Sequence, residues 1–224
     1  MSDGREAGFA ALVVHELRSP LAAMVGAARL LHARWQELDE TQRASLLALL
    51  ADEAGRVERL LGTLQDATLV AAGALGYSFA EVDVARVVAD AVAAAGLGRE
   101  GVGVTAAVAG PLPHVRGDAD RLRQALDNLI GNAVKASASG DTVEVRAESR
   151  DGFVRVSVSD RGPGVEAVDR ERIFAAFERA ADRPGAGLGL HVARTVAEAH
   201  GGTVELDPTP GGGATLTLVV PAAG

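Results

Sequence analysis

Apolar residues in the first 75 positions of the chain recur at helical spacing. In the second of two such stretches they advance by alternating steps of four and three, and Glu53 interrupts the series formed by Leu46, Leu50, Val57, Leu60, Leu64, Ala67 and Ala71. The first stretch carries a similar stripe of Val13, Leu17, Met24, Ala28, Leu31 and Trp35. Such a seam is typical of a coiled coil or helical bundle. The pattern predicts two long helices.

The two predicted helices are joined by the polar stretch QELDETQ, in which Asp39 is a candidate N-cap for the second helix. They form a hairpin, predicted as a domain over residues 1–75. Helices of about 30 residues extend roughly 45 Å, and a hairpin alone offers each apolar stripe one partner. We therefore expect two copies to pair as a dimeric four-helix bundle.

From residue 76 the pattern changes to short strand-like runs between helical segments. The runs GVTAAV, TVEVRAES, FVRVSVSD and ATLTLVV alternate with helical patterns near 84–95, 119–137 and 189–200. The glycine-containing stretch AAGALGYS marks the change. These features predict a separate α+β domain over residues 76–224, so the fold class is multi-domain, α followed by α+β.

Composition limits the possible partners and location. The 22 Lys and Arg residues against 30 Asp and Glu give a net charge of −8, which disfavours a nucleic-acid partner. The chain has no cysteine, which excludes disulfides, thiolate metal sites and a cysteine nucleophile and fits a cytoplasmic location. We find no apolar run of about 18 residues and no signal-peptide pattern, so we expect no membrane segment on this chain.

The stretch VVHELRSP places a titratable pair inside the first predicted helix. His15 lies about 200° round the helix from Val13, so we expect it to point away from the apolar stripe. Glu16 could accept a hydrogen bond from one ring nitrogen, and Pro20 tends to kink the helix just beyond. Taken alone, the segment is better explained as an ordinary solvated helix face.

Polar residues of the second domain suggest a site for a metal–nucleotide complex. Asn128 and Asn132 are four residues apart on one helix face and Lys135 follows three residues later. Amide oxygens suit Mg²⁺, and a lysine can approach phosphates. Asparagines on a helix are also commonly solvent-exposed, so this signal is weak by itself.

Two glycine-containing turns add to this picture. Asp160 ends a strand-like run and is followed by Gly162 and Gly164, where a carboxylate could accept a hydrogen bond from the amine of a base. A turn with Gly185, Gly187 and Gly189 immediately precedes a helix, a suitable anion cradle for phosphates. Either turn alone is compatible with a purely structural role.

Taken in order, these motifs resemble the sensor histidine kinase family. The order is HELRSPL, N-x-x-x-N-A-x-K, D-x-G-x-G, I-F-x-x-F and G-x-G-L-G-L, and the resemblance covers about residues 8–220. It implies a HisKA-type hairpin for dimerisation and phosphotransfer, followed by a GHKL-type ATP-binding domain, the Bergerat-type α/β sandwich. It also implies a protein histidine kinase that uses ATP and Mg²⁺.

The resemblance also implies a role for each matching residue. His15 would take the γ-phosphoryl group of ATP and pass it to an aspartate of a response regulator receiver domain, with Glu16 as adjacent base. Ser19 occupies the position that helps to dephosphorylate the regulator. The implied nucleotide and metal residues are Asn128 and Asn132 for Mg²⁺, Lys135 and Arg179 for phosphate charge, Asp160, Gly162 and Gly164 for adenine, Phe177 with Phe174 in the phenylalanine box, and Gly185, Gly187, Leu188 and Gly189 over the phosphates.

Two other functions are compatible with parts of this pattern. A GHKL-type ATPase carries a glutamate four residues before the metal-binding asparagine, where it activates water, but Asn128 occupies that position here. A phosphotransfer scaffold with weak nucleotide binding would have lost Asn132, Asp160 or the glycine turn, and all are present. The pattern therefore favours a kinase.

Overall fold

In the computed structural model the chain divides into two compact units, Met1–Asp66 and Ala67–Gly224. The structure describes residues 3–71, 76–96, 101–175 and 188–223. Within these ranges, the side chains of residues 3–16 and of positions 59, 60, 63, 64, 66, 67, 70 and 71 are not described. The division between the units falls inside the second helix, and the domain boundary after residue 75 stays a prediction.

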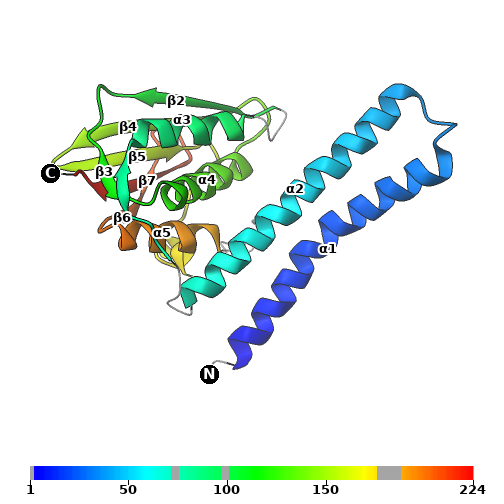
Figure 1. Cartoon of the computed structure of the whole chain (residues 1–224), viewed down its shortest axis with the longest axis horizontal. Helices are drawn as coiled ribbons and strands as arrows, with labels where there is room; N and C mark the ends of the chain where they lie inside the picture. The colour runs from blue at the N-terminus through cyan, green and yellow to red at the C-terminus, as the bar shows by residue number, and fades with distance from the viewer. Residues whose placement is uncertain (1–2, 72–75, 97–100, 176–187, 224) are drawn as a thin grey trace. The chain divides into compact units, whose positions relative to one another are not determined.

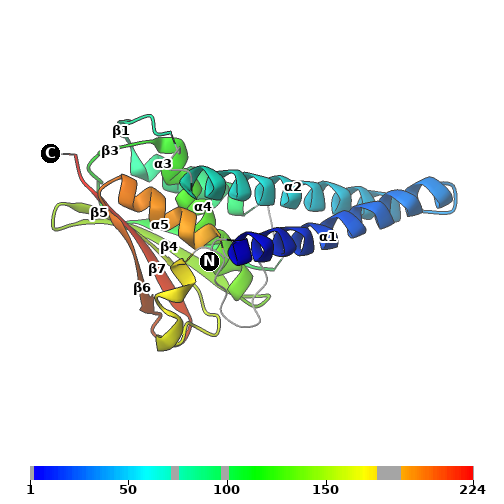
Figure 2. The same cartoon turned by 90° about the horizontal axis from the view of Figure 1, so that it is seen from below.

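The first unit is a helical hairpin made of α1 (Asp3–Arg34) and α2 (Glu40–Ala71), seen side by side in Figures 1 and 2. The predicted N-cap is confirmed, because Asp39 Oδ1 accepts a 2.7 Å hydrogen bond from the Gln42 N–H. Gln42 Oε1 in turn accepts one of 3.1 Å from the Asp39 N–H. This reciprocal pair satisfies two backbone donors at the start of α2.

The inward face of the hairpin follows heptad spacing. On α1 it consists of Leu17, Pro20, Met24, Ala27 and Leu31, and on α2 of Leu46, Leu50, Glu53 and Val57. Ala28 and Trp35, which the sequence pattern assigned to the stripe, are exposed. The difference arises because the seam runs through Pro20 and Ala27, and because α1 ends at Arg34, so that Trp35 belongs to the turn.

The second unit is built on a five-stranded sheet in the order β2-β4-β5-β7-β6, in which β2 and β4 are parallel and the other pairs antiparallel. Its strands are β2 (Gly103–Val108), β4 (Thr142–Arg150), β5 (Phe153–Ser159), β6 (Thr203–Pro208) and β7 (Ala214–Pro221). A small second sheet pairs β1 (Ala80–Val82) with β3 (Val115–Gly117).

Three helices cover one face of the large sheet (Figures 1 and 2). They are α3 (Val84–Ala95), α4 (Ala119–Ala136) and α5 (Gly189–Ala199). Two short 3₁₀ turns, η1 (Ala167–Asp169) and η2 (Arg172–Phe174), precede α5. The unit is therefore a two-layer α/β sandwich, as the sequence predicted.

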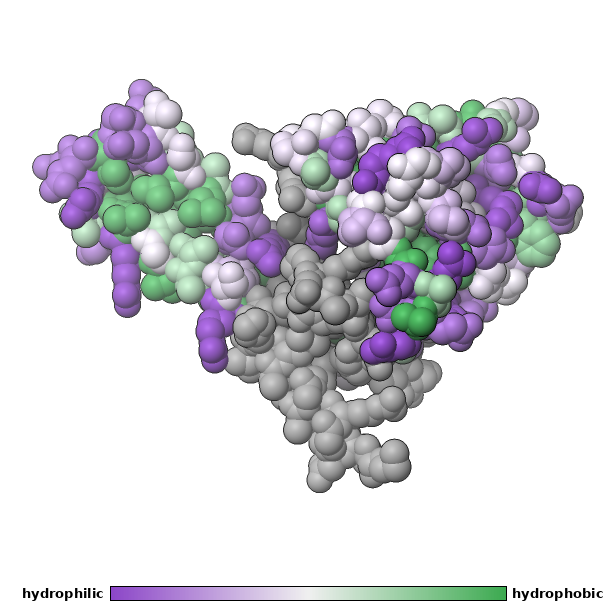
Figure 3. Space-filling view, turned by 180° about the vertical axis from the view of Figure 1, so that it is seen from behind, coloured by the Kyte–Doolittle hydropathy of each residue, from purple (hydrophilic) through white to green (hydrophobic). Residues whose placement is uncertain are grey.

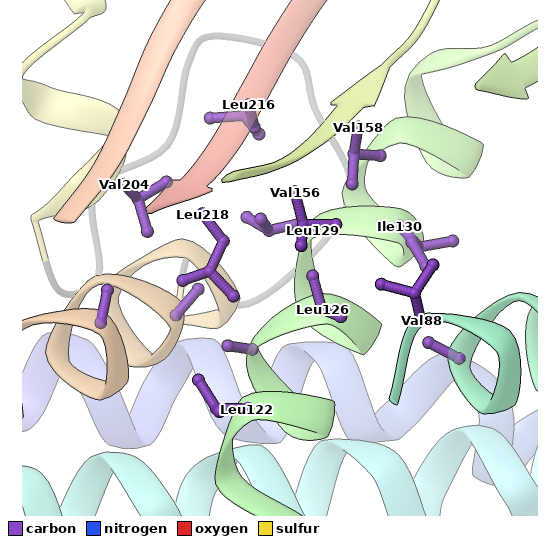
Figure 4. Packing of buried hydrophobic residues seen from close by; sticks show 14 of the residues in the cluster. Val88, Leu122, Leu126, Leu129, Ile130, Val156, Val158, Val204, Leu216 and Leu218 are labelled. Atoms are coloured by element: carbon purple, nitrogen blue, oxygen red, sulfur yellow. The ribbon is translucent and has the colours of Figure 1, made fainter. Parts of the chain in front are cut away.

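The core lies between the helices and this face of the sheet. Figure 4 shows Leu126 and Leu129 of α4 near Val156 of β5 and Leu218 of β7, with Leu122 further along the same helix. Each of these side chains is at most 2% exposed. Burying one such side chain stabilises the fold by roughly 1.5–3 kcal/mol, so α4 is firmly fixed on the sheet.

The predicted elements are largely confirmed. The three helices and four strands expected in the second unit all form within one or two residues of their expected bounds. The sequence pattern missed β1, β3 and β6, because two of these strands have three residues and the third ends in Pro208. None of the described helices combines the length and the apolar composition that a membrane span requires.

Glu53 gives a test of the hairpin seam. Its Oε2 is enclosed and accepts no hydrogen bond from a described residue, and its ion pair with Arg56 Nη1 is long, at 3.9 Å. Because an enclosed polar group without a hydrogen bond destabilises a fold by about 1–3 kcal/mol, we expect Glu53→Leu to raise the free energy of unfolding of the hairpin by a similar amount. Urea unfolding followed by the fluorescence of Trp35, the single tryptophan, measures it.

The matched control is Glu53→Gln, which keeps the shape and the buried polar group and should change stability much less. A hairpin that Glu53→Leu destabilises would contradict this interpretation, because the carboxylate would then make a favourable contact in solution.

Candidate functional site

Helix α4 carries the predicted metal-binding face. Its N-cap is Asp118, and its opposite side packs Leu126, Leu129 and Ile130 into the core at 0–2% exposure. Asn128 and Asn132 are half-buried on the other side, and Lys135 is exposed in the last turn. Lys135 is also the single lysine of the chain. The predicted arrangement of two amides and one cation along a helix is thus present.

Asp160 lies at the end of β5 and is 3% exposed. Its Oδ1 accepts hydrogen bonds from the Gly162 N–H, at 2.9 Å, and the Ala214 N–H, at 3.2 Å. No described residue donates a hydrogen bond to Oδ2. The carboxylate is therefore held in one orientation by backbone groups and presents a second oxygen as an acceptor.

Glycines allow the backbone around Asp160 to come close to α4. A Cβ at Gly162 would lie 2.5 Å from the Ala136 carbonyl oxygen and 3.0 Å from its Cβ. Gly164 has a φ of +73°, which favours glycine. The D-x-G-x-G loop thus lies directly against the C-terminal end of α4, one residue beyond Lys135.

The first residue of α5, Gly189, contacts α4 at Asn128. A Cβ at Gly189 would lie 3.2 Å from Asn128 Oδ1 and 3.5 Å from its Cγ, so the carboxamide lies over the first residue of α5. The N-terminus of a helix presents unpaired N–H groups and partial positive charge, which suit phosphate. Leu188, the residue before α5 that was predicted to lie over the phosphates, is buried at 1% exposure.

The structure therefore brings three of the predicted motifs together along α4. Asn128 contacts the start of α5, and Ala136, next to Lys135, contacts the Asp160 loop. Phe177, Arg179, Gly185 and Gly187 lie outside the described residues. Phe174 is buried at 8% exposure, as expected for a core aromatic residue, and the Arg194 guanidinium lies 5.6 Å from its ring centroid.

The predicted phosphoacceptor residues lie in α1. His15 and Glu16 are inside the helical range Asp3–Arg34, and their side chains belong to the part that is not described. Ser19 is exposed one turn after His15. Their proposed roles remain predictions.

Two residues of the site escaped the sequence analysis. Ala214 donates to the Asp160 carboxylate, and Gly213, at φ +104°, leaves no room for a Cβ against the Asp160 carbonyl group. The run of three glycines at 211–213 was the available signal for a close backbone approach. The sequence could not show that these glycines lie against Asp160, because that contact depends on the register between β5 and β7.

Comparison with known proteins identifies both units. Residues 5–71 match the family model of the His Kinase A (phospho-acceptor) domain. Residues 117–224 match that of the histidine kinase-, DNA gyrase B- and HSP90-like ATPase. The ATP binding domain of PrrB from Mycobacterium tuberculosis is 30% identical, with a TM-score of 0.56, over 65% of this chain and 98% of that one. The chain belongs to the sensor histidine kinase family.

Several relatives match nearly the whole chain. The crystal structure of full-length ShkA in complex with AMPPNP is 34% identical, with a TM-score of 0.67, and the match covers 96% of this chain and 45% of ShkA. The sensor-like histidine kinase SenX3 of Mycobacterium tuberculosis is 31% identical over 96% of this chain and 53% of its own length. The sensor histidine kinase ZraS of Klebsiella oxytoca is 34% identical over 96% of this chain and 46% of its own length. The chain thus spans about half the length of these curated relatives.

The contact between Gly162 and α4 can be tested by substitution. We expect Gly162→Ala to lower the free energy of unfolding of the second unit by about 1–3 kcal/mol, because the added methyl group would press on the Ala136 backbone. Thermal unfolding followed by circular dichroism measures this change.

Gly131→Ala is the matched control on α4. Nothing lies within 4 Å of a Cβ at that position, so the change should be neutral or stabilise the helix by up to about 1 kcal/mol. Equal effects of the two substitutions would mean that Gly162 does not approach α4 as closely as described.

Proposed function

We propose that this chain is the catalytic core of an ATP-dependent protein histidine kinase of a two-component system. In this proposal His15 accepts the γ-phosphoryl group of ATP and later passes it to an aspartate of a response regulator receiver domain. The observation that carries the proposal is the convergence on α4 of two half-buried asparagines, a buried and oriented carboxylate, and the glycine at the start of α5.

The described residues fit a magnesium–nucleotide complex. The carboxamides of Asn128 and Asn132 are hard oxygen donors four residues apart, and Mg²⁺ usually combines few protein ligands with phosphate oxygens. Mg²⁺ bound there would offset the negative charge of the phosphates. Lys135 would neutralise further phosphate charge, and Asp160 Oδ2 would accept a hydrogen bond from the exocyclic amine of adenine.

The transfer itself depends on positioning and charge. An unprotonated ring nitrogen of His15 forms a bond to the γ-phosphorus while the bond to the β–γ bridging oxygen breaks and ADP leaves. A hydrogen bond from the other ring nitrogen to Glu16 would stabilise the positive charge that develops on the imidazole. The in-line geometry requires the two units to approach each other during transfer.

We further propose that the hairpin forms a homodimer. Leu21, Val25, Leu30, Leu47 and Leu49 are 39–51% exposed, and Figure 3 shows apolar side chains gathered on the visible face of the hairpin near its turn. Contiguous exposed apolar surface of this kind typically marks an interface. Pairing of two hairpins as a four-helix bundle would cover it. A cytoplasmic location and the absence of a nucleic-acid partner remain predictions.

Autophosphorylation tests the central step. Incubation with labelled ATP and Mg²⁺ should give a phosphoprotein that is labile in acid and stable in base, and His15→Gln should abolish the label. The matched control is His32→Gln on the same helix, which should label like the unaltered protein because His32 lies in the last turn. Steady release of phosphate without label would favour an ATPase, and neither activity would favour a scaffold.

The adenine site makes a separate prediction. A hydrogen bond to a charged group contributes about 1.5–3 kcal/mol, so Asp160→Asn should raise the Kd for ATP roughly 10- to 100-fold. Calorimetric titration measures it, and sedimentation should show an unchanged oligomeric state. Asp90→Asn, at an exposed position of α3, is the matched control. An unaltered affinity of the Asp160 variant would mean that adenine binds elsewhere.

A further inference from the structure

The segment Gly76–Phe79, which precedes β1, is held on the second unit by specific contacts. The Ser78 N–H donates a 2.7 Å hydrogen bond to Asp118 Oδ2. The rings of Tyr77 and Phe79 contact the ring of His200, with centroid distances of 5.8 and 5.0 Å. We call Gly76–Phe79 the connecting segment, because it is the first stretch that the structure describes after α2 ends at Ala71. Its contacts converge on two residues, Asp118 and His200.

His200 is buried at 6% exposure at the C-terminus of α5. Its Nε2 lies 2.9 Å from the Asp118 backbone nitrogen, and its Nδ1 lies 2.7 Å from the Val196 carbonyl oxygen. A backbone N–H can only donate and a carbonyl oxygen can only accept. The ring is therefore neutral, with its proton on Nδ1, and it joins the end of α5 to the start of α4.

The ring of His200 occupies the space above Gly117. A Cβ there would lie 2.6 Å from His200 Cδ2 and 3.1 Å from a methyl carbon of Leu122. Because Gly117 has no side chain, the ring can lie against its backbone and accept the hydrogen bond from the Asp118 N–H. Glycine at position 117 is therefore required to make room for the His200 ring.

Asp118 completes the arrangement as the N-cap of α4. Its Oδ1 accepts hydrogen bonds of 3.1 Å from the N–H groups of both Asp120 and Arg121, while Oδ2 accepts the one from Ser78. Burial alone would raise the pKa of this carboxyl, but the backbone donors of Ser78, Arg121 and Asp120 and the Arg121 charge together hold its pKa below the usual value. The carboxylate is thus ionised when it binds the connecting segment.

We propose that His200 is a positioning residue of the kinase reaction: with Asp118 it ties the connecting segment to α4, so that docking of this segment sets the position of the nucleotide-binding face. This inference rests on the proposed function. Asn128 is ten residues into the same rigid helix, about 15 Å from Asp118, and the other end of α5 begins at Gly189, against Asn128. A shift of Asp118 and His200, at the N-terminus of α4 and the C-terminus of α5, therefore moves Asn128 and Gly189 on the two sides of the predicted phosphate site.

The inference predicts reciprocal coupling. If docking of the connecting segment favours nucleotide binding, a bound nucleotide must also favour docking. The two effects are equal, so undocking lowers the affinity for nucleotide by the same factor by which nucleotide strengthens docking. Because the connecting segment follows the helical hairpin, a signal that pulls on the end of α2 would reach the nucleotide site through Asp118 and His200. Couplings of this kind typically change affinity at least about fivefold.

Ser78 offers a sharp test in the full chain. Ser78→Pro removes the N–H that Asp118 accepts, whereas Ser78→Ala keeps it, and the side chain at this position is exposed. We expect the proline variant to raise the Kd of a fluorescent ATP analogue and the KM for ATP in autophosphorylation at least about fivefold, and the alanine variant to change them less than twofold. Equal affinities in both variants would overturn the inference.

His200 supplies a second, independent pair of variants. The amide of Gln can reach the position of Nε2 and accept the Asp118 N–H, whereas that of Asn is too short, so His200→Gln should restore most of the affinity that His200→Asn loses. Nitrogen NMR of the unaltered protein should find the His200 proton on Nδ1. A ring protonated on Nε2, or Gln and Asn variants with the same Kd, would contradict the inference.

These outcomes separate the inference from the proposed function. An unaltered protein that binds no ATP analogue and forms no phosphohistidine overturns the proposed function, and the inference with it. The second case is an unaltered protein that binds the ATP analogue and forms phosphohistidine. If its variants then keep the same Kd and KM and only unfold at a lower temperature, the inference alone is overturned.

Discussion

The close packing of α4 against the sheet is the constraint on which the candidate site depends. One side of the helix buries Leu126, Leu129 and Ile130, which fixes its rotation, and the polar side is then turned toward the loops. Glycine at 162 lets the Asp160 loop touch Ala136, and glycine at 189 lets α5 begin against Asn128. A larger side chain at either position would separate the groups that we propose to bind one nucleotide.

Much of this architecture was predictable from the sequence, because helical and strand periodicities are local signals. The seam of α2, the Asp39 cap and the bounds of α3, α4 and α5 follow from residues close together in the chain. The order of motifs also predicted the family. The small sheet escaped because strands of three residues carry little signal, and β6 escaped because its run ends in Pro208.

The remainder depends on contacts between residues distant in sequence. His200 could be recognised as important only when Asp118, 82 residues earlier, was found at its Nε2. Likewise the two backbone donors of Asp160 come from Gly162 and from Ala214, 54 residues later on β7. A single sequence contains no local pattern for such pairs, and this is why the nucleotide face was predicted while the residues that position it were not.

The two units divide the proposed chemistry between them. The hairpin presents an exposed apolar surface suited to self-association and carries the proposed acceptor, while the second unit positions the donor. The segment Gly76–Phe79, which follows α2 in the sequence, is bound at the N-terminus of α4 through the hydrogen bond from Ser78 to Asp118. Separate folding cores allow the donor to move toward the acceptor without disrupting either unit.

The single lysine of the chain permits the most direct test of the nucleotide face. The account predicts that ATP with Mg²⁺ protects Lys135 from an amine-directed acylating reagent, measured as the modified fraction of its peptide by mass spectrometry, and that Asp160→Asn loses this protection at the same ATP concentration. Modification of Lys135 at an unchanged rate under saturating ATP would show that the phosphates do not lie on α4.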